Sequence, residues 1–78
     1  MMTDLWEVMP EIEAGGTSFR VIGARLEAFA TRTNFNQPEG VARLIDIMKK
    51  LGVTAELERQ GAASGDIIQI GPHQFPWP

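Results

Sequence analysis

The residues that could do chemistry are few in this sequence, and they are scattered along it. The 78-residue chain has one histidine, His73, beside a Gly-Pro pair, and it has no cysteine. A catalytic histidine needs a carboxylate or a thiol arranged around it, and a structural zinc site needs several cysteine or histidine ligands. The sequence provides neither pattern. We therefore predict no catalytic residue and no metal-binding residue, and we expect His73 to be an exposed turn or strand residue.

Three glutamates near the N-terminus form a second group with chemical potential. Glu7, Glu11 and Glu13 occupy odd-numbered positions of one short segment, which would place their side chains on one face of a strand. Paired carboxylates can do acid–base work where a cleft separates their pKa values. Because charged side chains mostly remain in water, we interpret these three as the solvated face of an amphipathic strand.

The eight glycines do not form a phosphate-binding motif. Neither G-x-x-x-x-G-K-[ST] nor G-x-G-x-x-G occurs, so we predict no cofactor-binding residue. Every glycine except Gly40 lies at an expected element boundary, where we expect it to supply a positive φ. Gly40 instead falls in the first turn of an expected helix, where glycine costs about 1 kcal/mol relative to alanine. Close packing of that helix end is our hypothesis for it.

Charge and composition exclude several classes of function. The formal net charge is −3, and the seven basic residues are spread from Arg20 to Arg59 instead of gathering on one face. Nucleic-acid binders concentrate lysine and arginine, so we expect no direct nucleic-acid binding. No apolar run approaches the roughly 18 residues that span a bilayer, and no signal peptide is visible. We expect a cytoplasmic protein without membrane attachment.

Aromatic side chains supply the remaining candidates for a functional surface. Trp6, Phe75 and Trp77 lie close to the two ends of the sequence, and His73 is near the last two. Such residues can dock onto a partner, and we take these four as the possible partner-contact residues. The alternative is that the aromatic rings close the core of a small domain.

The first elements that must position these residues form a β-hairpin. From residue 6 to 13, apolar and polar residues alternate, with Trp6, Val8 and Ile12 on the inward side. Pro10 lies in the same inward series and lacks an N–H, which predicts an edge strand or a bulged one. A Gly-Gly pair then predicts a tight turn, and residues 17–22 predict the returning strand.

Three helices are expected next. Residues 24–33 show helical spacing of apolar residues. The second helix is expected to begin with a capping box formed by Asn36 and Glu39, and to end at Gly52. Thr54 is then expected to cap the N-terminus of a short third helix, which a glycine closes.

Two further strands, at residues 67–70 and 74–77, complete the pattern. The order is therefore ββ-ααα-ββ. It predicts an α+β fold in which two hairpins form a four-stranded sheet with the helices packed on one face. We expect residues 1–78 to form a single domain, and this pattern does not determine the order of the strands in the sheet.

Residues 21–77 carry an ordered set of short motifs. They are Val21-Ile22-Gly23, Arg25-Leu26-Glu27, Thr33-Asn34-Phe35-Asn36, Leu44 and Met48, Leu51-Gly52-Val53, Leu57 and Gly61, Gly65-Asp66, Ile70-Gly71, and Phe75 with Trp77. With this ordered set, the segment resembles the C-terminal domain, or OCT domain, of the Obg family of GTPases. Two positions depart from the family pattern, since Asn34 stands where Asp is common and Pro76 where an acid is expected.

The resemblance implies a parent protein with a glycine-rich N-terminal domain, a central P-loop GTPase domain and this tail. The family is associated with assembly of the large ribosomal subunit and with growth and stress control, including the stringent response. GTP and Mg²⁺ would be bound only by the GTPase domain, whose motifs are missing from these 78 residues. The resemblance therefore implies a non-catalytic regulatory or interaction domain, monomeric alone, that contacts the parent GTPase domain or a ribosome-associated protein.

Two other functions stay open from the sequence. A small ligand-binding regulatory domain for a nucleotide or metabolite would need convergent polar residues, and the sequence indicates few. An oligomerisation module would use an exposed sheet edge, since unpaired strand edges can pair with another chain.

Overall fold

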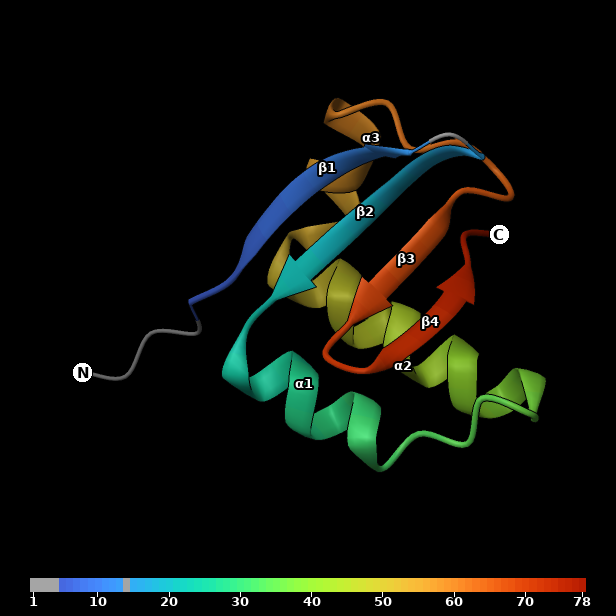
Figure 1. Ribbon diagram of the computed structural model, residues 1–78. Coiled ribbons are helices and arrows are strands. Elements are labelled where there is room, and N and C mark those ends of the chain that lie inside the picture. Colours follow the sequence, from blue (N-terminus) through green and yellow to red (C-terminus); the bar gives the residue numbers. More distant parts are fainter. Residues whose placement is uncertain (1–4, 14) are drawn as a thin grey trace.

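The computed structural model describes residues 5–13 and 15–78, and it confirms the ββ-ααα-ββ order (Figure 1). The elements, in chain order, are β1 (Glu7–Glu13), β2 (Gly16–Ile22), α1 (Ala24–Thr31), α2 (Pro38–Leu51), α3 (Val53–Arg59), β3 (Ile67–Ile70) and β4 (His73–Pro76). The expected α+β fold with a four-stranded sheet is therefore confirmed.

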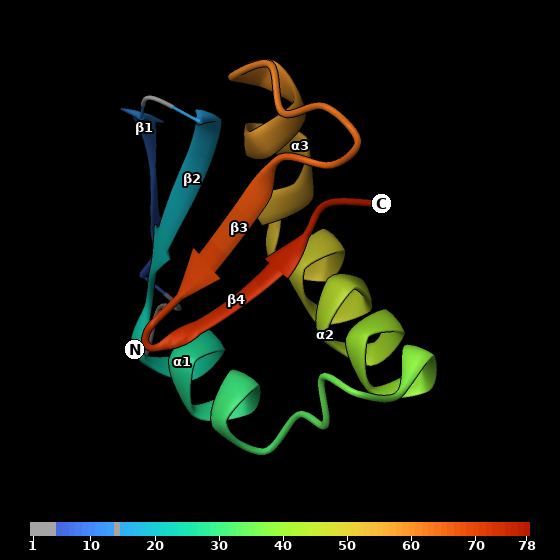
Figure 2. The same ribbon diagram turned by 45° about the vertical axis from the view of Figure 1, so that its right-hand side comes forward.

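The sheet is mixed, and its strand order is β1-β2-β3-β4. Each hairpin is antiparallel, while the two central strands, β2 and β3, pair in parallel. Parallel neighbours need a long connection, and here it contains all three helices. Figure 2 shows the consequence, because all three helices lie on the same side of the sheet.

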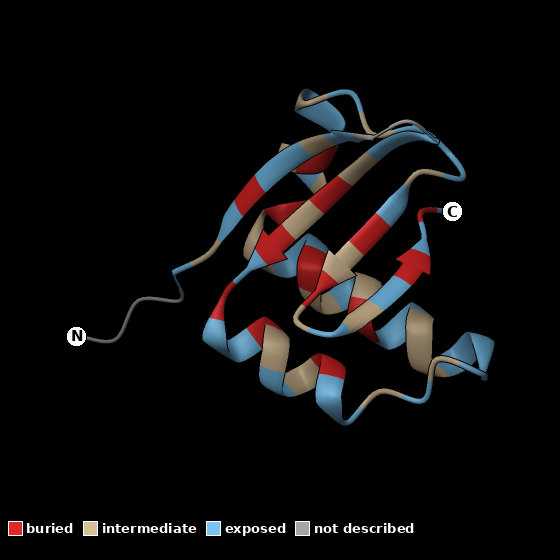
Figure 3. Ribbon diagram, in the orientation of Figure 1, coloured by how far each residue is buried: buried red, intermediate tan, exposed pale blue. Residues whose placement is uncertain are grey.

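The core lies between the helices and the sheet, and alternation along the strands determines which strand residues enter it (Figure 3). The buried hydrophobic residues of the described chain are Val8, Phe19, Val21, Leu26, Ala30, Leu44, Met48, Val53, Leu57, Ile68, Ile70, Phe75 and Trp77. Burying a side chain of the size of leucine contributes about 1.5–3 kcal/mol. Since so short a chain has a small core, each of these positions matters for stability.

The edge strands carry prolines, as expected for β1 and also in β4. Pro10 is exposed in β1 and Pro76 is exposed in β4, and each lacks the N–H that an added strand would use. The expectation that Ile12 faces inward is wrong, because its side chain is 88% exposed. Ile12 pairs with Thr17, which is also exposed, at the hairpin end that the core does not reach.

Positive φ values occur at Gly16, Gly52, Gly61, Gly65 and Gly71, but the expectation fails for Gly15 and Gly23. Gly23 has an extended backbone with φ 173°. It is buried, and the residues just before β1 approach it closely, since a Cβ there would lie 3.0 Å from the Cβ of Trp6 and 3.1 Å from the backbone oxygen of Leu5. The glycine is therefore required by close packing.

The caps expected for the second and third helices are both wrong. Helix α2 begins at Pro38, and its N-cap residue Gln37 makes no side-chain capping hydrogen bond. Asn36 does not form the box with Glu39; its backbone N–H donates to Oδ1 of Asn34 at 3.0 Å. Thr54 lies inside α3, because left-handed Gly52 ends α2 and directly precedes α3.

Gly40 is explained by the close packing that the sequence suggested. A Cβ at this position would lie only 2.6 Å from the backbone oxygen of Asn34. The Gln37 N–H donates to the same oxygen at 3.2 Å, so the connector between α1 and α2 is folded against the first turn of α2. Only glycine fits there without a shift of the connector.

Candidate interaction site

The four possible partner-contact residues do not form one surface. Phe75 and Trp77 are buried, with exposed fractions of 4% and 8%. Trp6 is half-buried on the other side of the fold, where its indole N–H donates to the backbone oxygen of Leu51 at 3.1 Å. His73 lies in strand β4, but the expectation that it is exposed is wrong, because it is half-buried. Their role as partner contacts stays a prediction, and the structure gives Phe75, Trp77 and Trp6 definite packing roles.

His73 and Phe75 are brought together by Phe35, which belongs to the connector between α1 and α2. The rings of Phe35 and His73 stack with centroids 5.2 Å apart and an interplanar angle of 18°. The rings of Phe35 and Phe75 are 5.9 Å apart and tilted by 34°. Aromatic pairs at these separations are favourable beyond their buried area. Phe35 thus ties the connector to β4.

An apolar groove begins at this aromatic cluster. It runs between the connector, the N-terminal half of α2 and the end of β4, and its volume is about 580 Å³. We call it the α2–β4 groove. Its lining is Phe35, Asn36, Pro38, Val41, Ala42, Ile45, Phe75, Pro76 and Pro78. No charged residue lines it, so the groove can accept an apolar surface with little desolvation of polar groups.

The groove exists because α2 is apolar over more than one face. Leu44 and Met48, four residues apart, are fully buried against the sheet. Val41 and Ile45, also four residues apart, are only half-buried and line the groove. Helical spacing alone does not separate these two pairs, because all four residues follow one i, i+3, i+4, i+7 series. The broad apolar arc of this helix was the signal for a second, unfilled surface.

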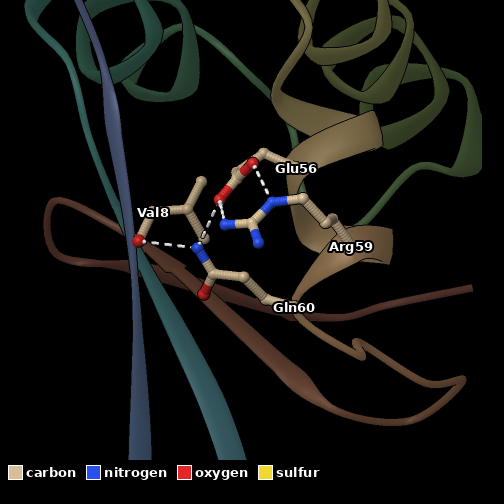
Figure 4. A network of polar contacts seen from close by, with 4 residues as sticks. All are labelled: Val8, Glu56, Arg59 and Gln60. Atoms are coloured by element: carbon tan, nitrogen blue, oxygen red, sulfur yellow. Dashed lines mark hydrogen bonds and ion pairs between the residues drawn. The ribbon is translucent and has the colours of Figure 1, made fainter.

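A polar network fastens α3 to β1 (Figure 4). The Glu56 carboxylate accepts hydrogen bonds from Arg59, at 2.8 Å from Nε and 2.5 Å from Nη2, and from Nε2 of Gln60 at 2.8 Å. Gln60 Nε2 also donates to the backbone oxygen of Val8 at 3.1 Å. These contacts link the end of a helix to the edge strand, which is a structural role.

The hydrogen bonds of this network also shift its titration. Those from Arg59, with a further one from Gln60, lower the pKa of Glu56 from 4.5 to about 2, and the same carboxylate raises the pKa of Arg59. A general acid or base works best with a pKa near the working pH. Glu56 is therefore a fixed negative charge near neutral pH.

The N-terminal glutamates lie as predicted where the structure describes them. Glu7 is exposed, and Oε2 of Glu11 lies 3.4 Å from Nε of Arg20 on the open face of the sheet. Nη2 of Arg20 also donates to Oε1 of Gln69 at 3.3 Å. The side chain of Glu13 lies outside the described part of the chain. These contacts form a solvated polar patch.

Within residues 5–13 and 15–78, no group of three or more His, Asp or Glu side chains is placed to hold a metal ion. Among the helices of the same part of the chain, none is long and apolar enough to cross a membrane.

The fold defines a class of small α+β domains in which three helices cover one face of a four-stranded mixed sheet, here with an apolar groove at one end of α2. The family described as "Domain of unknown function (DUF1967)" matches residues 10–77. The chain belongs to this family, which is the C-terminal domain of the Obg GTPases. The resemblance seen in the sequence is thereby confirmed.

The curated relatives are full-length proteins named GTPase Obg. The chain is 38% identical over 73 residues to that of Elusimicrobium minutum (strain Pei191), covering 94% of this chain and 15% of the relative. It is 41% identical over 64 residues to that of Onion yellows phytoplasma (strain OY-M), covering 82% and 15%. It is 35% identical over 66 residues to that of Roseiflexus castenholzii (strain DSM 13941 / HLO8), covering 85% and 15%. The chain thus spans about 15% of the length of these relatives, and no solved structure matches it.

Proposed function

We propose that this chain is a non-catalytic regulatory and interaction domain of an Obg-type GTP-binding protein. The observation that carries the proposal is the match of residues 10–77 to a domain that recurs in proteins named GTPase Obg. The parent protein would act in the cytoplasm, in assembly of the large ribosomal subunit and in the control of growth under stress. GTP and Mg²⁺ would be bound by its GTPase domain.

The α2–β4 groove is the surface through which the domain would act, and its occupant would be an apolar surface of the parent GTPase domain. The relatives extend well beyond the matched segment, so such a partner would belong to the same polypeptide. A tethered partner is present at high effective concentration, and a groove of modest area is then sufficient for docking. The uncharged lining favours an apolar contact over a strongly charged one.

The sheet edges argue against the oligomerisation alternative. Pairing between edge strands needs a continuous row of free N–H and C=O groups. Pro10 in β1 and Pro76 in β4 each interrupt that row on one edge. We therefore propose that the isolated domain is monomeric.

The test compares a full-length Obg-type protein carrying this domain with versions that lack it or carry one substitution in the groove. Ala42→Gln places a polar side chain in the groove, and Ala55→Gln is the matched control because Ala55 is exposed on α3 outside the groove. We expect deletion and Ala42→Gln to change the rate of GTP hydrolysis in the same direction, while Ala55→Gln leaves the rate unchanged.

The outcomes separate the possible partners. If Ala42→Gln abolishes ribosome co-sedimentation and leaves the rate of GTP hydrolysis unchanged, the occupant of the groove is an external partner and not the GTPase domain. GTP hydrolysis by the isolated 78-residue chain would contradict the non-catalytic role. An unchanged rate and unchanged co-sedimentation after deletion would overturn the proposed function as a whole.

A further inference from the structure

A second hollow lies on the side of α2 that faces α1, and its lining is polar. It has a volume of about 400 Å³ and is formed by the end of α1, the connector and the first two turns of α2. We call it the arginine cavity. Its lining is Phe29, Arg32, Thr33, Asn34, Gln37, Glu39, Gly40 and Arg43. It shares no residue with the α2–β4 groove, so its function is independent of the proposed one.

Two guanidinium groups line this cavity without a carboxylate partner. Among the residues that the structure describes, neither Arg32 nor Arg43 has an acidic oxygen within 4.0 Å. The chain has ten acidic residues against seven basic ones, so acids are not scarce. Arg20, Lys50 and Arg59 are each paired with one. The unpaired charges of Arg32 and Arg43 meet at one hollow.

Arg32 contacts an aromatic ring, and Arg43 is left without an ion pair on its own helix. The guanidinium carbon of Arg32 lies 5.8 Å from the centroid of the Phe29 ring, a cation–π distance. Glu39 is four residues before Arg43 on α2, a spacing at which such pairs often form, yet they form no ion pair here. Glu39 therefore opposes an anion through its charge without occupying the guanidinium of Arg43.

Amide groups of the connector complete the set of donors. The Asn34 side chain uses its oxygen to accept the Asn36 N–H, and its side-chain nitrogen is engaged in no hydrogen bond within the described part of the chain. Gln37 contributes a second amide to the lining. The close approach of Gly40 to Asn34 fixes the connector against α2 and so keeps these amides beside the arginines.

An adjoining hollow gives the site an apolar side. This adjoining hollow, also about 400 Å³, is lined by Phe29 and Arg43 together with Ala42, Asp46 and Ile47. Ala42 also lines the α2–β4 groove, so only the arginine cavity itself is separate from the groove. Asp46 is paired with Lys50 at 3.0 Å, so its charge is already compensated. A molecule with an anionic group between the arginines could place an apolar part along Phe29 and Ile47.

We infer that the arginine cavity binds the phosphate or pyrophosphate group of a small phosphorylated molecule. Guanidinium groups present paired N–H donors that match phosphate oxygens, and charge-assisted bonds of this kind are the strong ones. A small molecule fits better than a nucleic acid, because the cavity is a hollow of about 400 Å³ formed by one short connector and parts of two helices. The net charge of −3 also repels a long polyanion.

The test is an NMR titration of the isotope-labelled 78-residue chain with sodium pyrophosphate at low ionic strength. We expect saturable shifts of backbone amides confined to residues 29–47. Arg43→Gln should weaken binding about tenfold, since hydrogen bonds to charged groups are worth about 1.5–3 kcal/mol and each 1.4 kcal/mol is tenfold. Glu39→Gln should strengthen binding by about threefold, because it removes a nearby like charge from the site.

The control is Lys49→Gln, which removes one positive charge from an exposed position of α2 outside both hollows. It should leave the affinity within about twofold of the original, since exposed charges at a distance are screened. Thermal unfolding of each variant checks that the fold is kept, and all three positions are exposed.

Three results would overturn the inference. One is the lack of any shift at pyrophosphate concentrations of tens of millimolar. Another is an equal loss of affinity in Lys49→Gln and Arg43→Gln, which would show only diffuse attraction to positive charge. The third is tighter binding of a short RNA than of pyrophosphate with the same dependence on Arg43, which would assign the cavity to nucleic acid.

Discussion

The two ends of α2 differ in how completely they are packed. At the C-terminal end, left-handed Gly52 turns the chain, Val53 is buried, and the Trp6 indole donates to the backbone oxygen of Leu51. At the N-terminal end, Gln37 provides no side-chain cap, and the connector folds back through Asn34. The α2–β4 groove and the arginine cavity lie on opposite sides of this second end.

The difference indicates that the two ends of this helix have different roles. The C-terminal end of α2, which we call the closed end, packs with α3 and β1 and stabilises the fold through burial and satisfied backbone groups. The N-terminal end is the open end. The open end presents two surfaces of different chemistry, one apolar and one positively charged. In so small a domain few residues can be spared from the core for binding, and here the unfilled surface lies at one end of α2.

The largest expected effect is loss of packing at the closed end. Leu57 is fully buried in the core, on helix α3, which packs against β1. Leu57→Ala should therefore lower the free energy of unfolding by about 2–5 kcal/mol. Phe35→Ala, at the open end, removes a larger side chain that is only half-buried, and we expect a smaller loss. Urea denaturation of both variants measures the difference. An equal or larger loss for Phe35→Ala would remove the distinction between the two ends.

A smaller effect is expected where the open end is held in shape. Gly40→Ala gains helix propensity, yet its Cβ would meet the Asn34 oxygen at 2.6 Å, and overpacking of this kind costs about 1–3 kcal/mol. We expect net destabilisation, measured by urea denaturation, together with shifts in the amide resonances of residues 32–37. Gly52→Ala is the comparison at the closed end, where a positive φ of 92° costs about 1–2 kcal/mol. Stabilisation by Gly40→Ala, as at an ordinary exposed helical glycine, would show that the connector is not fixed by this contact.

Most of the fold could be predicted from the sequence because it depends on local patterns. Period-2 and helical spacing located all seven elements, and Gly52 and Gly61 take the expected positive φ. The strand order could not be derived, because the choice of β2 and β3 as parallel neighbours depends on how the helices pack. The capping box failed for a local reason, since the Asn34 side chain competes for the Asn36 N–H.

The sites were harder to predict than the fold. Aromatic content pointed to Phe75 and Trp77, which are buried in the core, although Phe75 also reaches the α2–β4 groove. The arginine cavity was missed because Arg32 and Arg43 lie eleven positions apart on either side of the connector. Their meeting depends on the approach of Gly40 to Asn34, a single contact that no periodicity reveals.

The smallest expected effect concerns the charge network at the closed end. The folded pKa of Glu56, about 2, is below its ordinary value of 4.5, so ionised Glu56 stabilises the fold at all pH values above about 4.5. This contribution is lost as the pH falls from about 4.5 to 2. Glu56→Gln should therefore be less stable than the original chain at neutral pH. The difference in stability between the two proteins should narrow as the pH falls from about 4.5 to 2, as measured by thermal unfolding at a series of pH values.

The control for Glu56→Gln is Glu58→Gln on the same helix, since Glu58 is exposed and is not a partner in the side-chain hydrogen bonds of Arg59 and Gln60. This substitution also removes one negative charge but keeps the network. The variant should therefore lose stability in acid as the original chain does. Because Arg59 is exposed, added salt should also narrow the difference in stability between Glu56→Gln and the original chain. If the difference in stability stays constant from pH 7 to pH 2, the charge of Glu56 does not stabilise the fold, and burial together with the Gln60 hydrogen bond to Val8 joins α3 to β1.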